Sequence, residues 1–392
     1  MLKLITLLLT SSMTVMAGAT IAPALPQIQE HFSQSPNSEF WVKLLLTLPA
    51  LLTAIGAPVA GAIIDQFGRK RLLAAAVALY GLAGGSGLVL NTLPGLLVGR
   101  ALLGLSVGAI MTTSIALIAD YFQGARRNQV MGLQAAFMGY GGVAFLTLGG
   151  FLAGIGWRMP FLIYLTAFAV LPLVIWTLTE PAPEGSPQTA IPDHPNEPAP
   201  RIPTAAIALI YLVTFGMMVA FYMIPVQIPF YLRGFDGVSS TATGLAIAAC
   251  TLASALVSMR YGSLKARFGF ASILAMLFGL MGVGYVIISQ GATYAVVFGG
   301  LVIAGFGLGL LLPNMNVWLN AIAPATIRGK ALGGLTTSMF LGQFCSPILL
   351  QPVANRVGLK SAYGLVGMLL IGLAVGTVGL VLWSRKQQAQ AP

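Results

Sequence analysis

Charged side chains are scarce in this chain of 392 residues. They make up 7% of it, against about 25% in a typical soluble domain. The class of soluble globular proteins is therefore excluded. The two cysteines, Cys250 and Cys345, lie inside apolar runs, where we expect small buried side chains and no disulfide. The apolar runs contain no pair of acids and no deep histidine, so the sequence predicts no catalytic centre, metal or cofactor and does not support an enzyme.

Long apolar runs dominate the chain instead. Hydrophobic residues form 57% of it, and uncharged runs of about 20 residues are long enough to cross a bilayer as helices. Every span must be helical, because lipid offers no hydrogen-bond partner to backbone N–H and C=O groups that are left unpaired. The first run is too long for a signal peptide and is interpreted as a span. The runs predict an all-α membrane protein with twelve transmembrane helices, at about 4–26, 41–63, 72–90, 94–118, 129–153, 159–178, 204–230, 240–259, 270–289, 293–318, 331–354 and 361–383.

The positions of the cations predict the orientation. The formal net charge is +11, and most lysines and arginines lie in the tails or in the even-numbered connections. The odd-numbered connections hold few, among them Lys43 and Arg233, and Arg100 is the one deep ionisable group expected inside a span. This asymmetry is typical of the positive-inside bias and does not indicate a nucleic-acid partner. Both termini are therefore expected to be cytoplasmic.

The segment 180–203 interrupts the pattern of spans. It contains eight prolines and almost no large apolar residues, which is typical of an extended linker. The linker predicts a first six-helix bundle at 1–179 and a second at 204–392. A shift of 201 residues aligns Gly61, Phe67 and Gly68 with Gly262, Phe268 and Gly269, which indicates an internal repeat of the kind found in transporters.

Four charges in the segment GAIIDQFGRKRLL, residues 61–73, stand between two spans. The segment resembles the loop signature G-x-x-x-D-x-x-G-R-[RK] of the major facilitator superfamily, which it matches at Gly61, Asp65, Gly68, Arg69 and Lys70. Together with twelve spans and a repeat, this resemblance covers the whole chain. It implies two pseudo-symmetric six-helix bundles that expose a central cavity to the two sides of the membrane in turn.

The resemblance also implies a conformational latch, formed by the five signature residues and Asp120. Asp65 would lie against the start of the eleventh span, at 326–331, where a helix N-terminus favours a carboxylate. Arg69 would pair with Asp120. The latch would form in the outward-open state and break when the two bundles rock. Alternatively, the cations only fix the topology and Asp65 offsets part of their charge.

In this family the first, fourth, seventh and tenth spans surround the cavity, which places polar and soft side chains at a predicted substrate site. Arg100 would attract an anionic group or, alternatively, bind carbonyl groups of neighbouring helices. The side chains of the seventh span recur on one face, which is also the pattern of ordinary packing. The predicted substrate-binding residues are Met16, Thr20, Arg100, Gln134, Tyr211, Phe215, Met218, Tyr222, Gln227, Asn314, Asn316 and Gln343.

The resemblance favours a monomeric transporter of the bacterial inner membrane that exports small, largely apolar organic molecules. Its partners would be a small-molecule substrate and the lipid bilayer. The alternatives are a facilitator or exporter of one metabolite, such as a sugar, siderophore or lipid, and a membrane enzyme or a receptor that transports nothing. No acid is placed deep in a span, so proton coupling is expected to be weak or absent. Asp120 and the pair Glu30 and His31 are the remaining proton-carrier candidates.

Overall fold

The computed structural model describes residues 1–181, 202–324 and 326–390, and the elements in these ranges are all helices. Their bounds are α1 Leu2–Ala19, η1 Ala22–Ala24, α2 Leu25–His31, α3 Ser38–Phe67, α4 Arg69–Gly85, η2 Ser86–Leu88, α5 Leu93–Tyr121, α6 Gly124–Ile155, η3 Met159–Leu165, α7 Thr166–Thr177, α8 Thr204–Arg233, α9 Ser240–Lys265, α10 Phe270–Gln290, α11 Tyr294–Leu308, α12 Leu311–Ile322 and α13 Arg328–Gln390. The all-α prediction is confirmed.

Eleven stretches of the described chain are long and apolar enough to span a membrane. The last of them, α13, holds two spans, because Gly358 has φ 80° and ψ 157° and interrupts its helical backbone. A positive φ of this kind favours glycine, which has no Cβ to clash. The prediction of twelve spans is therefore confirmed, although two predicted spans are interrupted by turn residues. The first is divided into α1, η1 and α2, and the tenth into α11 and α12 at Gly309 and Leu310.

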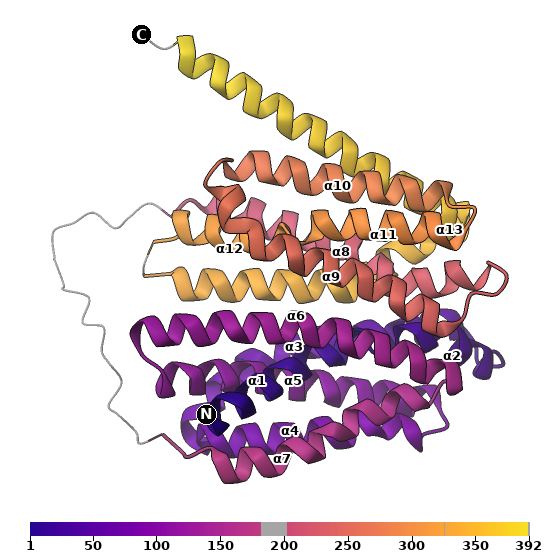
Figure 1. Ribbon diagram of the computed structural model, residues 1–392, viewed down its shortest axis with the longest axis vertical. Coiled ribbons are helices and arrows are strands. Elements are labelled where there is room, and N and C mark those ends of the chain that lie inside the picture. Colours follow the sequence, from indigo (N-terminus) through magenta and orange to yellow (C-terminus); the bar gives the residue numbers. More distant parts are fainter. Residues whose placement is uncertain (182–201, 325, 391–392) are drawn as a thin grey trace.

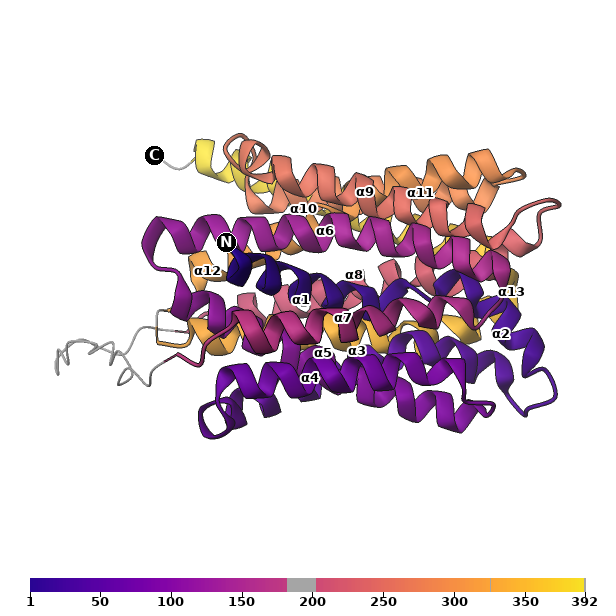
Figure 2. The same cartoon turned by 60° about the horizontal axis from the view of Figure 1, so that its bottom comes forward.

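The helices form two groups (Figure 1). The first group holds α1–α7 and the second holds α8–α13, and α6 lies beside α9 along their boundary (Figures 1 and 2). The repeat is visible in the helix starts, since α4 and α10 begin 201 residues apart, as do α5 and α11. The predicted linker boundaries stay a prediction, because most of 180–203 lies outside the described residues.

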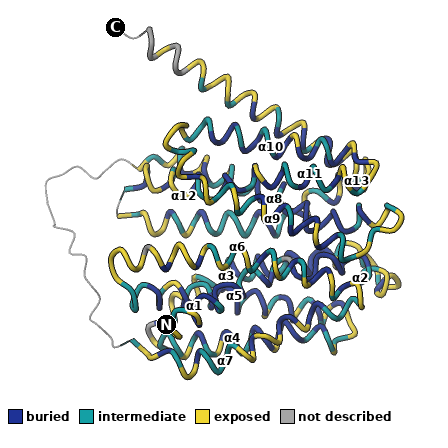
Figure 3. Tube along the Cα trace, in the orientation of Figure 1, coloured by how far each residue is buried: buried dark blue, intermediate teal, exposed yellow. Residues whose placement is uncertain are grey.

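The molecule has two ends, named here by the segments they carry. The linker end holds the start of α1, the α3–α4 turn and the end of α7, and Figure 2 shows the end of α13 there as well. The far end holds the α2–α3 and α8–α9 connections. Exposed residues follow the linker-end half of α6, whereas buried residues gather toward the far end (Figure 3). The two groups therefore meet most closely at the far end.

Small residues set the distances between neighbouring helices. A Cβ atom on Gly108 of α5 would lie 2.6 Å from the backbone nitrogen of Ala57 in α3. Across the group boundary, a Cβ atom on Gly150 of α6 would lie 2.9 Å from Cα of Gly244 in α9. Close backbone approach through small residues is how helices associate in lipid, where apolar side chains gain little by leaving the solvent.

Candidate functional site

A cavity of about 370 Å³ lies between the two helix groups. Its wall comes from both groups, chiefly α1, α3, α5 and α6 on one side and α8, α9, α12 and α13 on the other. Most of the lining side chains are aliphatic, aromatic or thioether groups, including Met111, Met138, Phe145, Phe221, Met339 and Phe340. A largely apolar cavity of this size suits a small organic molecule.

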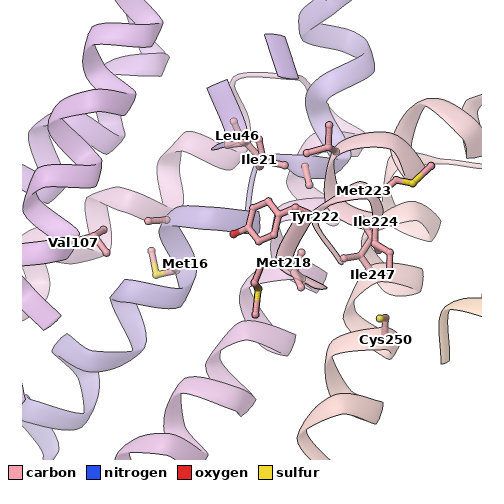
Figure 4. Packing of buried hydrophobic residues seen from close by; sticks show 14 of the residues in the cluster. Met16, Ile21, Leu46, Val107, Met218, Tyr222, Met223, Ile224, Ile247 and Cys250 are labelled. Atoms are coloured by element: carbon pink, nitrogen blue, oxygen red, sulfur yellow. The ribbon is translucent and has the colours of Figure 1, made fainter. Parts of the chain in front are cut away.

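Four of the predicted substrate-binding residues line this cavity: Thr20, Met218, Tyr222 and Gln343. Figure 4 shows the Tyr222 hydroxyl pointing away from α8 toward the region of Met16 on α1. A Cβ atom on Gly18 of α1 would lie 3.0 Å from that hydroxyl, so Tyr222 reaches across to the opposite group. Met16 itself is buried in the core and is not part of the cavity wall.

The predicted face of the seventh span, now α8, packs mainly against α13. Tyr211 donates a hydrogen bond to Ala331 O at 2.7 Å, and Phe215 lies against Gly342. Gln227 donates to Gln351 Oε1 at 2.7 Å. The periodic stripe is real, but most of it packs on a neighbouring helix, and only Met218 and Tyr222 reach the cavity. The expectation that Tyr211, Phe215 and Gln227 would line the cavity is therefore corrected.

Three predicted amide side chains also lie outside the cavity wall. Asn314 is fully buried, where it accepts a hydrogen bond from Tyr261 and donates to Phe270 O, and it joins α12 to α9 and α10. Asn316 is exposed and donates to Leu312 O of its own helix. Gln134 donates to Ser11 Oγ at 2.7 Å and ties α6 to α1. Each amide side chain is therefore hydrogen-bonded to a residue of its own helix group.

Arg100 is 1% exposed and lies inside the first group, away from the cavity wall. Its Nε donates to Leu45 O at 3.0 Å, and its Nη1 donates to Tyr164 Oη at 3.0 Å. The guanidinium also lies over the rings of Phe161 and Tyr164. The structure thus matches the alternative of binding to a neighbouring carbonyl and does not bring Arg100 to the predicted substrate site.

A buried polar network at the far end was not foreseen from the sequence. Lys43, expected in a loop, is 1% exposed within α3 and donates to Glu39 Oε1 at 2.9 Å and to Gln351 Oε1 at 2.5 Å. Gln351 in turn donates to Glu39 Oε1 and Asn355 Oδ1, each at 2.6 Å, and accepts from Gln227. The spacing of Glu39 and Lys43 by four residues was the available signal. Arg100 is therefore not the one deep ionisable group.

The network joins the two groups, since Glu39 and Lys43 belong to the first and Gln351 to the second. Other hydrogen bonds between the groups lie at the same end, including Gln27 to Ser240 and Arg233 to Glu30. The hydrogen bonds between the groups whose two partners are both described lie at the far end. The far end is closed in this structure, and the cavity lies between that closure and the linker end.

The signature loop forms the α3–α4 turn at the linker end. Gly68 has φ 82°, the conformation that favours glycine, and Arg69 Nη1 lies 2.5 Å from Asp120 Oδ2. Glu180 accepts hydrogen bonds from the backbone nitrogens of Arg69 at 2.5 Å and Lys70 at 3.0 Å. A carboxylate there stabilises the start of α4, because a helix N-terminus carries partial positive charge. Sequence reasoning placed Glu180 only in the linker.

The predicted latch is therefore only partly visible. Arg69 and Asp120 are brought together, but both belong to the first group, so this ion pair is not a contact between the groups. The pair is present while the far end is closed, and its response to rocking of the two groups stays a prediction. Gly61 lies on α3 near Thr112. The side chain of Asp65 lies outside the described residues, so its docking at 326–331 stays a prediction.

Comparison with known proteins gives the family. A sequence model of the Major Facilitator Superfamily matches residues 7–237 and 210–392. The chain is 27% identical to the 3-(3-hydroxy-phenyl)propionate transporter of Escherichia coli (strain K12), covering 86% of this chain and 83% of that protein. It is 25% identical to the class C tetracycline resistance protein of Escherichia coli, covering 97% and 98%.

A solved structure shows the same fold. A bacterial homolog of the human lysosomal transporter Spinster, in an inward-facing and occupied conformation, superposes with a TM-score of 0.73 at 18% identity, covering 96% of this chain and 94% of that one. The match of the family model over the chain, the two groups of spans and the cavity between them agree. The chain belongs to the Major Facilitator Superfamily and is a multi-pass membrane transporter of small molecules, not an enzyme.

Proposed function

We propose that this transporter exports small, largely apolar organic molecules by alternating access. The observation that carries the proposal is the cavity, which both groups line with mostly apolar and thioether side chains. Methionine and aromatic side chains can repack around ligands of different shape, which suits a broad substrate range. Relatives named as a tetracycline resistance protein and a multi-drug resistance efflux pump support the direction of export.

The distribution of cations supports a cytoplasmic linker end. At that end, Arg69, Lys70 and Arg71 form the first turn of α4, Lys265 ends α9, and Arg267 lies between α9 and α10. Positive side chains collect in the cytoplasmic loops of membrane proteins. Both termini are then cytoplasmic in the bacterial inner membrane, and a closed far end corresponds to an inward-facing state. We take the functional unit to be a monomer, because the cavity is complete within one chain.

A second candidate is a facilitator or exporter of one specific metabolite. It is favoured by the similarity to the 3-(3-hydroxy-phenyl)propionate transporter, which covers most of both chains. The two candidates differ in breadth. A broad exporter moves several unrelated apolar compounds, whereas a specific transporter moves one compound and close analogues of it.

Transport into reconstituted vesicles tests the proposal. The protein is placed in liposomes, and uptake of a panel of apolar dyes and antibiotics is measured with and without an imposed pH gradient. Met218→Trp fills the cavity wall and is expected to reduce transport at least tenfold. Leu380→Trp, a control at a side chain that is 68% exposed on α13, is expected to leave transport unchanged. Movement of a single compound by the wild type would favour the specific transporter, and movement of none would refute both.

A further inference from the structure

We propose that the cavity selects substrates without net charge, and that Tyr222 and Gln343 recognise a neutral hydrogen-bonding group on them. This inference rests on the proposed transport of small organic molecules and narrows it to a chemical class: an apolar or aromatic body carrying an uncharged carbonyl, amide or hydroxyl group. It separates this chain from its relative named for 3-(3-hydroxy-phenyl)propionate, whose substrate bears a carboxylate at neutral pH.

The first step concerns charge. Among the described side chains that line the cavity, none is Asp, Glu, Lys, Arg or His. The deep cations are held elsewhere: Arg100 by Leu45 O and Tyr164, and Lys43 by Glu39 and Gln351. An ionic substrate would therefore find no counter-ion on the wall.

The missing counter-ion matters most when the substrate is enclosed between the two groups. Even while the linker end admits water, a charged ligand loses part of its hydration to the apolar wall when it binds. Once both ends close, it must exchange that water for thioether, aromatic and aliphatic groups. An unpaired ion in such surroundings loses its hydration without compensation, whereas a neutral group needs only a hydrogen-bond partner. The closing step, which every substrate must pass, therefore rejects ions of either sign.

The second step concerns the hydrogen bonds that the wall can offer. The hydroxyl of Thr20 donates to Met16 O, that of Thr53 to Pro49 O and Gly104 O, and that of Thr251 to Ile247 O, so each is bonded to a backbone carbonyl. Short hydroxyl side chains on a helix commonly bond the carbonyl of the preceding turn in this way. These residues therefore contribute their methyl groups to the wall more than their hydroxyls.

Tyr222 and Gln343 are different, because their polar atoms lie too far out along the side chain to bond the carbonyl of the preceding helical turn. Tyr222 is 8% exposed and its hydroxyl points across the cavity toward α1 (Figure 4). The amide nitrogen of Gln343 lies 3.9 Å from the sulfur of Met218, a weak acceptor. One phenol and one amide, each able to donate and to accept, are thus free for a neutral polar group of a ligand.

Calorimetric titration of the purified full-length protein tests the inference with four probes of one shape: 3-phenylpropanamide, 3-phenylpropanoate, 3-phenylpropylammonium and propylbenzene. The amide is expected to bind at least tenfold more tightly than either ion. Equal or tighter binding of the carboxylate or the ammonium would overturn the charge rule while leaving transport of organic molecules intact. If none of the four binds while a transported dye does, the neutral polar group is wrongly assigned.

Variants separate recognition from folding. Gln343→Leu and Tyr222→Phe are each expected to weaken amide binding about 3- to 10-fold, as loss of one net hydrogen bond predicts, and to leave propylbenzene binding within about twofold. Tyr294→Phe, which removes a hydroxyl bonded to Ala242 O outside the cavity, is the matched control. If a substitution weakens the binding of the amide and of propylbenzene equally, its side chain has a structural role. That result would refute the assignment of Tyr222 and Gln343 to recognition of the polar group. Failure to transport any compound at all would instead refute the proposed function.

Discussion

Gln351→Leu should open the far end. The side chain makes two hydrogen bonds across the group boundary, accepting from Lys43 and donating to Glu39, at 2.5 Å and 2.6 Å. Leucine keeps most of the volume and removes both. In the state with an open far end, water replaces these partners, so the substitution destabilises only the closed arrangement.

The size of the effect follows from the charges involved. Hydrogen bonds to charged groups contribute about 1.5–3 kcal/mol each, so two give roughly 3–6 kcal/mol. Glu39 is 47% exposed in its side chain and Lys43 keeps it as a partner, so the lower bound is the better guide. A loss of about 3 kcal/mol shifts a two-state equilibrium roughly 100-fold toward the open far end.

Distance measurement by double electron–electron resonance is the assay. Spin labels are placed at Gln34 and Ala292, exposed far-end positions in the two groups, after Cys250 and Cys345 are replaced by alanine. Gln351→Leu is expected to move the main population to longer distances, and the exposed cation change Lys360→Ala is the control. Thermal unfolding checks that the variant is folded. A folded variant with the wild-type distance distribution would show that this network does not hold the far end closed.

Three further results are expected. Gly150→Ala should also populate the open far end, because the added methyl group would lie 2.9 Å from Cα of Gly244. Gly372→Ala, which has open space around it, is the control and should leave the far end closed. The same pair of spin labels would show either outcome. Glu180→Gln should lower the stability by about 0.3–1 kcal/mol through loss of charge at the α4 N-terminus, seen as a lower melting temperature, and an unchanged one would contradict the capping role. An imposed pH gradient should change vesicle transport by less than about twofold, because none of the described side chains that line the cavity carries a carboxyl group. Movement of about one proton per substrate that survives Asp120→Asn would refute this view of coupling.

The sequence predicted the parts of the molecule that depend on local pattern. Uncharged runs gave the spans, because any helix in lipid must be apolar and long enough to cross it. The signature loop was recognised because its glycines and charges are close in sequence, and Gly68 does adopt a positive φ at the α3–α4 turn. Helix breaks such as Gly309 were missed, since periodicity does not show where another backbone approaches.

The site was predicted less well, because periodicity gives a face and not the neighbour that the face contacts. The stripe on α8 was placed on one side of the helix, but three of its five members pack against α13 or join the far-end network. Lys43 looked like a loop cation because its partner Gln351 is 308 residues away in sequence. Asn314 looked like a ligand group because the hydroxyl of Tyr261 that satisfies it is 53 residues away in sequence. Polar residues in spans are thus readily found, while their partners come only from tertiary structure.

The carboxylate of Glu180 has a practical consequence for dividing the protein. It holds the start of α4, so this residue belongs to the folded first half although it stands at the head of the proline-rich segment. Two fragments meant to be expressed separately and reassembled should therefore be cut after Glu180, so that the first fragment keeps its own cap. A cut two residues earlier would leave the amides of Arg69 and Lys70 to water and weaken the turn on which the family signature depends. The same rule applies when this linker is grafted into another transporter. Its first residue, Glu180, should be joined to the half of the host that carries the turn corresponding to α3–α4.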